Sequence, residues 1–151
     1  MPKIVISDTS CLVVLDKINE LELLQKIYSE VITTPEVKSE FRNPLPNWIK
    51  IQSPKNIALQ DELESKVDKG EASAIALGVE TSDCVVILDD LKARKVAESL
   101  RLNFTGTLGL LVKAKEVGII SAVRPLLIKL HSVGLRFSKE VEREILNQSG
   151  E

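Results

Sequence analysis

In this 151-residue chain, the acidic side chains are the candidates for catalysis or metal binding. The single histidine, His131, excludes zinc motifs with paired histidines, and Cys11 and Cys84 lack the spacing of a metal site. The sequence contains neither a P-loop nor a dinucleotide-binding glycine motif. Hard oxygen ligands without His or Cys suit Mg²⁺ or Mn²⁺, and such a site can activate water for phosphodiester cleavage.

Carboxylates stand at the ends of two predicted strands. The apolar run Ile4-Val5-Ile6 is followed by Asp8, and the run 84–88 is followed by Asp89 and Asp90. Ligand sites in parallel α/β sheets lie outside the carboxyl ends of the strands, so these acids can meet although they are far apart in sequence. A helix that begins there also points its positive end at the same place.

Each of these acids also has a purely structural interpretation. Asp8 and Asp90 each precede a predicted helix, where an aspartate commonly caps the first turn. This favours Asp89 over Asp90 as the ligand. Ser10 either orients the Asp8 carboxylate or bonds the local backbone.

Two predicted helices add further acids. Glu71 opens a stretch of small and apolar residues that runs to Leu77, which is unusual unless the acid has a partner. Glu40 lies near the end of its helix, where the helix dipole disfavours a negative charge, although it can equally be an ordinary surface acid. Three or more carboxylates at one point repel each other unless a cation neutralises them.

Charge is distributed unevenly. Residues 1–91 hold 9 basic and 16 acidic side chains, whereas residues 92–151 hold 11 and 6, within a net charge of −2. The cluster Lys92, Arg94 and Lys95 is either a solvated helix face or part of a phosphate-binding rim beside the acidic pole. Aromatic residues make up only 3%, which argues against a base-stacking platform of the RRM or OB type.

Short apolar strands alternate with helices along the chain, and this pattern predicts one α/β domain, residues 1–151, with a parallel sheet covered on both faces. The expected strands cover residues 3–7, 31–33, 48–51, 84–88 and 102–105. The expected helices cover residues 9–16, 19–28, 35–41, 59–67, 71–79, 92–100, 107–118, 122–133 and 138–146.

The same composition bears on location and assembly. No apolar run approaches the roughly 20 residues of a membrane helix, and the acid at position 8 comes too early for a signal peptide. We expect the two cysteines to be reduced and buried, and the protein to be cytoplasmic. Apolar helix positions predict an exposed apolar patch that forms a homodimer: Leu12, Val13, Leu21 and Leu24.

Five motifs follow one another in a characteristic order along nearly the whole chain. They are Ile4-Val5-Ile6-Ser7-Asp8-Thr9-Ser10, Glu40, Gly70-Glu71-Ala72-x-Ala74-Ile75-Ala76-Leu77, Leu88-Asp89-Asp90-Leu91-Lys92-Ala93-Arg94 and Thr105-Gly106-Thr107-Leu108-Gly109. This ordered set resembles a PIN domain, and most closely a PIN-like bacterial and archaeal branch related to VapC-type toxins. The resemblance implies a three-layer α/β/α sandwich around a central parallel sheet, and metal-dependent ribonuclease activity.

The resemblance also implies roles for individual residues. Asp8, Glu40, Glu71 and Asp89 would be the catalytic acids, and Mg²⁺ or Mn²⁺ would be held by Asp8, Glu71 and Asp89, with Asp90 as an alternate ligand. Substrate-binding or orienting roles fall to Ser10, Lys92, Arg94, Lys95, Thr105 and Thr107. The chain departs from many PIN nucleases, which have Asp at the place of Glu71 and a T-x-D-x-x-F segment at the place of residues 88–92.

Three functions compete at this point. The first is a metal-dependent endoribonuclease, the toxin of a type II toxin–antitoxin pair, with RNA and a cognate antitoxin protein as partners. The second is a non-catalytic PIN-like module that binds RNA or a protein. The third is a phosphoacceptor or phosphatase domain with Asp8 as nucleophile, but Asp8-Thr9-Ser10 lacks the second Asp of D-x-D phosphatases and residues 1–7 hold no acidic pair.

Overall fold

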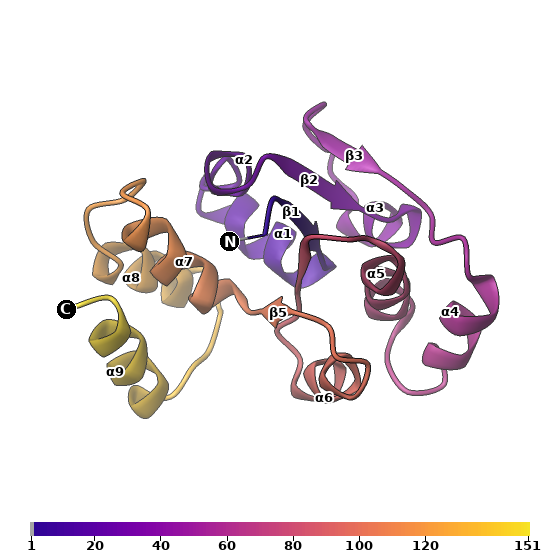
Figure 1. Ribbon diagram of the computed structural model, residues 1–151. Helices are drawn as coiled ribbons and strands as arrows, with labels where there is room; N and C mark the ends of the chain where they lie inside the picture. Colours follow the sequence, from indigo (N-terminus) through magenta and orange to yellow (C-terminus); the bar gives the residue numbers. More distant parts are fainter. Residues whose placement is uncertain (1) are drawn as a thin grey trace.

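A computed structural model describes residues 2–151 and shows one sheet of five parallel strands (Figure 1). The strands are short and mostly apolar, as the strands of a sheet covered on both faces should be. They are arranged in the order β3-β2-β1-β4-β5. Their bounds are β1 (Ile4–Ser7), β2 (Glu30–Thr33), β3 (Ile49–Ile51), β4 (Cys84–Ile87) and β5 (Phe104–Thr105).

Nine helices connect and cover these strands within residues 2–151. Several begin where the sequence carries a capping side chain, for example Thr34 before Pro35 and Ser138 before Lys139. The helices are α1 (Thr9–Lys17), α2 (Leu23–Ile27), α3 (Pro35–Phe41), α4 (Ile57–Leu63), α5 (Lys69–Glu80), α6 (Leu91–Ser99), α7 (Thr107–Glu116), α8 (Arg124–Ser132) and α9 (Lys139–Gln148).

The sheet has an apolar core on each face, because successive side chains of a strand point to opposite faces. Val5 of β1 belongs to the core formed with α1, α2, α3, α7, α8 and α9, whereas Ile6 belongs to the core formed with α4, α5 and α6. Figure 1 shows α7, α8 and α9 gathered on the left and α4 and α5 on the right. The predicted three-layer α/β/α sandwich with a central parallel sheet is therefore confirmed.

The strand order creates a switch point between β1 and β4. The chain leaves β1 toward β2 and β3 on one side, and leaves β4 toward β5 on the other. Ser7 and Ile87 pair at the last position of this register, so the residues that follow them emerge side by side. Crevices at such switch points are where open α/β sheets bind their ligands.

One predicted helix start is wrong. Asn19 was expected to begin a helix, but it adopts a left-handed conformation with φ of 58° just after α1, and α2 begins only at Leu23. The backbone N–H of Glu20 donates to the carbonyl of Leu15, a bond that closes the end of α1. Asparagine tolerates this conformation, so the residue that resembled an N-cap terminates the preceding helix.

The predicted apolar dimer patch is also wrong. Leu12 and Leu24 are completely buried, and Val13 and Leu21 pack against the same core. Leu12 and Val13 lie on α1, Leu24 lies on α2 and Leu21 lies in the turn before α2. All four belong to or pack against the same apolar core, so they form no exposed patch. The homodimer stays a prediction, but these four residues no longer support it.

No helix within residues 2–151 is both long and apolar enough to cross a membrane.

Candidate active site

Asp8 lies directly after β1 and serves two purposes. Its Oδ1 accepts a hydrogen bond from the Cys11 backbone N–H at 3.0 Å, which caps α1. Its Oδ2 accepts a longer bond from the Asp89 backbone N–H at 3.4 Å. The side chain is only 2% exposed. Asp8 is therefore a cap and also one of two acids that meet across the switch point.

Asp89 follows β4 and is held by Thr107 at the start of α7. The Thr107 backbone N–H donates to Asp89 Oδ1 at 2.7 Å, and its hydroxyl donates to Oδ2 at 2.6 Å. Gly106 caps α7 without a side chain of its own, and a Cβ there would lie 3.0 Å from Asp89 Oδ1. The positive end of α7 thus faces the carboxylate.

Burial and the neighbouring acid Asp89 alter the ionisation of Asp8. Burial first, and then the neighbouring charge of Asp89, raises the pKa of Asp8 from 3.8 to about 8. Hydrogen bonds from the backbone N–H groups of Cys11 and Asp89 act in the opposite direction, and Glu71 raises it further. A pKa raised in this way shows that ionising Asp8 beside Asp89 is energetically unfavourable, and a bound cation would remove that repulsion.

Glu71 lies at the start of α5 in a capping box with Asp68. The Glu71 backbone N–H donates to Asp68 Oδ1 at 2.8 Å, and the Asp68 N–H donates to Glu71 Oε1 at 3.3 Å. Burial, the charge of Asp68 and, less strongly, that of Asp90 raise the pKa of Glu71 to about 7. The spacing Asp68-x-x-Glu71 is a local signal for this box that the sequence interpretation did not use.

Glu71 opens onto a cavity of about 500 Å³ that Asp90, Ser10 and Lys92 also line. Asp90 caps α6 by accepting a bond from the Ala93 backbone N–H at 3.1 Å. Ser10 is exposed, and within residues 2–151 it makes no hydrogen bond to Asp8. Asp90 is thus the N-cap of α6, as one of its two sequence interpretations predicts. It also lines the same cavity as Glu71 and helps to raise the pKa of that residue.

Glu40 reaches the same end of the sheet from α3. Thr9, which follows Asp8 in the sequence, donates a hydrogen bond from its hydroxyl to Glu40 Oε1. A Cβ at Gly70 would come within 2.3 Å of Glu40 Oε1, so the absence of a side chain at Gly70 makes room for this carboxylate at the start of α5. Glu40 therefore joins α1, α3 and α5 at the edge of the site.

The basic side chains of α6 separate into different positions. Arg94 is half-buried: its Nε donates to the Leu88 carbonyl at 2.8 Å, and its guanidinium lies 5.7 Å from the centre of the Phe104 ring. Lys92 faces the cavity of Glu71, whereas Lys95 is exposed and lines neither this cavity nor the one beside Asp89. Arg94 is thus the cation that the fold holds beside Asp89.

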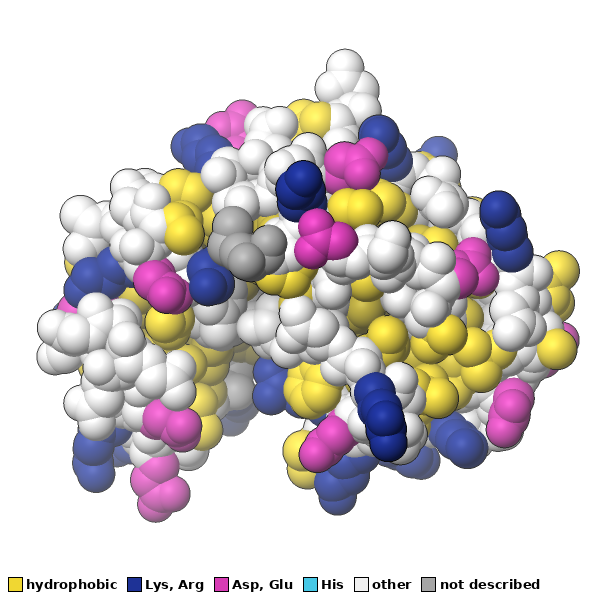
Figure 2. Space-filling model, viewed as in Figure 1, with side chains coloured by type: hydrophobic (Ala, Val, Ile, Leu, Met, Phe, Trp, Pro, Cys, Tyr) yellow, Lys and Arg dark blue, Asp and Glu magenta, His cyan; other side chains and the backbone are white. Residues whose placement is uncertain are grey.

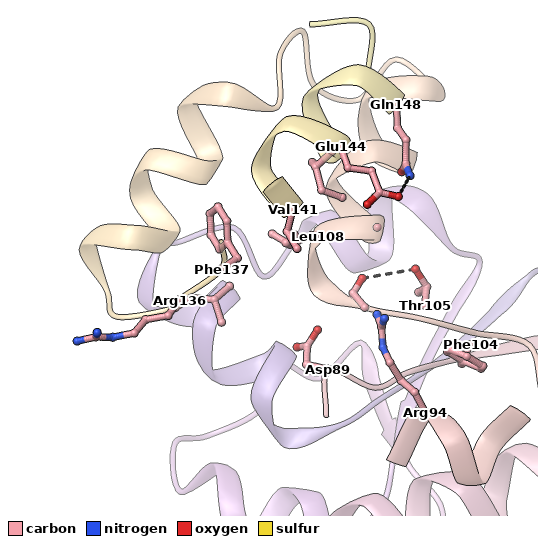
Figure 3. Close-up of a pocket in the computed structure, with 14 residues that line it drawn as sticks. Asp89, Arg94, Phe104, Thr105, Leu108, Arg136, Phe137, Val141, Glu144 and Gln148 are labelled. Carbon is pink, nitrogen blue, oxygen red and sulfur yellow. Dashed lines mark hydrogen bonds between the residues drawn. The ribbon is translucent and has the colours of Figure 1, made fainter. Parts of the chain in front are cut away.

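Thr105 and several residues that the sequence interpretation missed line a second cavity, of about 530 Å³, on the other side of Asp89 (Figure 3). Figure 2 shows the molecule hollowed between the parts that carry α9 and α6. The missed residues come from the segment before α9 and from α9 itself, far from every motif in sequence. They are Leu135, Arg136, Phe137, Val141, Glu144, Ile145 and Gln148.

The donor set around Asp8 fits a hard divalent cation. Within residues 2–151, no three His, Cys, Asp or Glu side chains converge closely enough to enclose an ion. Mg²⁺, however, keeps several waters and is usually held by one or two carboxylates together with substrate phosphates. The pair Asp8 and Asp89 offers two carboxylates of this kind, with Glu71 near enough to affect the pKa of Asp8.

Comparison with known families agrees with this geometry. The family model DUF3368, described as a PIN domain, matches residues 4–151. Among curated proteins, no sequence matches the chain. The matched region includes the five strands and all the acids discussed above. With its parallel sheet and its acids at the switch point, the chain belongs to the PIN-domain family and has that family's nuclease-type fold.

Proposed function

We propose that this protein is a metal-dependent endoribonuclease. The observation that carries the proposal is the meeting of Asp8 and Asp89 at the switch point between β1 and β4. Two carboxylates close enough for the charge of Asp89 to help raise the pKa of Asp8 to about 8 suit a site that receives a divalent cation. The phosphodiester of an RNA strand is a substrate class that such a site can serve.

Each residue of the site has a proposed role in this reaction. Asp8 and Asp89 would hold Mg²⁺ or Mn²⁺, with Glu71 at its side and Asp90 as an alternate. When bound, the cation would neutralise the phosphate and activate water. Thr107 keeps both oxygens of Asp89 in place, and Arg94 offers guanidinium N–H groups to a phosphate oxygen. Glu40 and Ser10 border the site from α3 and α1.

The same substitution at the two ends of one strand tests the proposal. Asp89→Asn should abolish RNA cleavage in Mg²⁺ or Mn²⁺, because the amide cannot supply the lost charge. Asp83→Asn is the matched control, since Asp83 precedes β4 at the opposite end of the sheet and its φ of 54° suits asparagine. Cleavage that is equal in both variants would contradict the proposal.

The biological setting that we propose is the toxin of a type II toxin–antitoxin pair in the cytoplasm, with a cognate antitoxin protein as partner. Membership of the PIN family supports the setting, as does the resemblance to VapC-type toxins. A small antitoxin gene beside the gene for this chain, whose product restores growth of cells that express the chain, is the expected finding. Growth that is unaffected by expression of the chain would argue against a toxin.

A non-catalytic module that binds RNA or a protein is the second candidate. It is favoured by one observation, the lack of three metal-binding side chains around a single point within residues 2–151. Titration with Mn²⁺ separates the two functions. A nuclease of this kind should gain thermal stability on binding Mn²⁺ at Asp8 and Asp89, whereas a binding module need not.

A further inference from the structure

The cavity beside Asp89 has the size and position of a substrate subsite. Its volume of about 530 Å³ lies within the range of roughly 300–1,000 Å³ that is usual for small-ligand pockets. One wall comes from α6, β5 and the start of α7, and the other from α9 and the segment before it (Figure 3). Asp89 belongs both to this cavity and to the acid pair.

The end of the cavity next to Asp89 contains a cationic group, Arg94, that can bind a phosphate. Arg94 is anchored through its Nε and lies against the Phe104 ring, which leaves its terminal nitrogens for a ligand. Among the residues that the structure describes, the ion pairs do not include Arg94. A Cβ at Gly106 would lie 2.1 Å from Arg94 Nη2 and 3.0 Å from Asp89 Oδ1, so both groups face one backbone position. An anchored guanidinium with free N–H groups binds phosphate oxygens well.

The lining at the end of the cavity away from Asp89 suits a flat heterocycle. It includes the apolar side chains of Phe137 and Val141 (Figure 3). α9 adds Glu144 and Gln148, one turn apart, with Gln148 Nε2 3.3 Å from Glu144 Oε1. A carboxylate beside an amide can accept two adjacent N–H donors and donate to a neighbouring carbonyl.

Among the four RNA bases, guanine alone presents that complement on its Watson–Crick edge. Its ring N–H and exocyclic amino group are adjacent donors, and its carbonyl follows them. Adenine, cytosine and uracil each lack the pair of adjacent donors. Single-stranded RNA exposes these edges, and proteins read them by stacking and hydrogen bonds.

We propose that this cavity binds a guanine nucleotide adjacent to the scissile phosphate of a single-stranded RNA. The inference rests on the proposed nuclease function and adds a substrate preference to it. A nucleotide is favoured over a protein segment because the cavity is continuous with Asp89 and contains an anchored cation beside it. The phosphate would lie at Arg94, and the base would reach Glu144 and Gln148.

Titration of the full-length protein with each of the four ribonucleoside monophosphates tests the inference. The measurement is the change in backbone amide chemical shifts, made without divalent metal so that nothing depends on catalysis. Guanosine monophosphate should shift the amides of Gly106, Phe137 and Gln148, and should bind about tenfold more tightly than the other three. Gln148→Ala should reduce this preference, because it removes the donor to the guanine carbonyl.

Two matched substitutions complete the design. Val141→Phe should fill the cavity and abolish binding, whereas Val79→Phe should not affect it, because Val79 is a similarly exposed helical valine that lines no part of this cavity. Equal binding of the four nucleotides, or unchanged binding by a folded Val141→Phe variant, would overturn the inference. So would shifts that follow protein concentration alone, which would assign the cavity to a second copy of the chain.

The outcome also separates this inference from the proposed function. Selective binding of guanosine monophosphate by a protein that cleaves no RNA would support the subsite and contradict the nuclease. RNA cleavage that Asp89→Asn abolishes, together with no preference among the nucleotides, would support the nuclease and overturn the subsite.

Discussion

Thr107 holds both carboxylate oxygens of Asp89, one through its backbone N–H at 2.7 Å and the other through its hydroxyl at 2.6 Å. Thr107 is completely buried at the start of α7, 18 residues beyond the acid that it orients. This double contact ties the end of β4 to α7. It also fixes the Asp89 carboxylate at a place where its charge acts on Asp8.

The hydroxyl of Thr107 should therefore matter for the response to metal. Thr107→Val keeps the shape and the backbone donor but removes the hydroxyl, and we expect a loss of about 1–2 kcal/mol in the free energy of unfolding. The thermal stabilisation by Mn²⁺ should also fall, because Asp89 loses its second anchor. Thr107→Ser, which retains the hydroxyl, is the control and should stay near the parent. An undiminished Mn²⁺ response in Thr107→Val would show that the hydroxyl does not position Asp89.

Gly70 and Glu40 should be energetically coupled. Gly70→Ala places a methyl group where Glu40 Oε1 lies, so the carboxylate must leave the Thr9 hydroxyl. We expect Glu40→Ala to cost about 1 kcal/mol in the parent and almost nothing in the Gly70→Ala background. Chemical denaturation of the four proteins of this double-mutant cycle measures the coupling. Additive effects would show that the two residues do not compete for this space.

The stability of the metal-free protein should fall as the pH rises toward about 8, the pKa of Asp8 in the folded protein. The unfolded chain gives up this proton near its ordinary value of about 4, so the folded state binds more protons between the two values. Stability from this group is complete below about pH 4 and is lost by up to about 1.4 kcal/mol per pH unit above it.

Asp8→Asn should flatten this dependence, because an amide does not titrate. Its side chain can still accept the bond from the Cys11 N–H, so α1 keeps its cap. The variant should melt no lower than the parent without metal, should gain less stability from Mn²⁺, and should not cleave RNA. Denaturation across the pH range in a chelating buffer checks the first point. Parallel curves for the two proteins would contradict the raised pKa.

Glu151 should stabilise the arrangement of α7, α8 and α9. Its carboxylate accepts bonds from the Val123 N–H at 2.7 Å and the Arg124 N–H at 3.2 Å, and it lies 3.2 Å from Lys115 Nζ. These contacts, with the Val123 bond the strongest, lower the pKa of Glu151 to about 2. Its contribution is therefore present above about pH 4.3, the ordinary glutamate pKa, and is lost as the pH falls toward about 2.

Glu151→Ala should accordingly lower the free energy of unfolding by about 1 kcal/mol at neutral pH, as the loss of a helix cap does. Glu98→Ala is the control, because Glu98 is an exposed acid on α6 away from these helices. Thermal denaturation at neutral pH and near pH 2 checks both the size and the pH range. An equal effect of the two substitutions would exclude the capping role.

Much of the fold could be predicted from the sequence because it is encoded locally. Apolar β-branched runs mark β1 and β4, and side chains such as Thr34 and Ser138 mark helix starts, because a cap bonds within its own first turn. The placement of Asp8 and Asp89 at strand ends followed from the same runs. Asn19 was misread because the same side chain suits a helix start and a helix end.

Only the tertiary structure decided which of these residues meet. The pairing of β1 with β4 places Asp8 beside Asp89, and no local signal specifies which strands become neighbours. Packing on the sheet buried Leu12, which the helix pattern alone left free to form an interface. The cavity beside Asp89 depends on α9, which begins 50 residues later in the chain. Such contacts arise from the packing of whole elements rather than from sequence spacing.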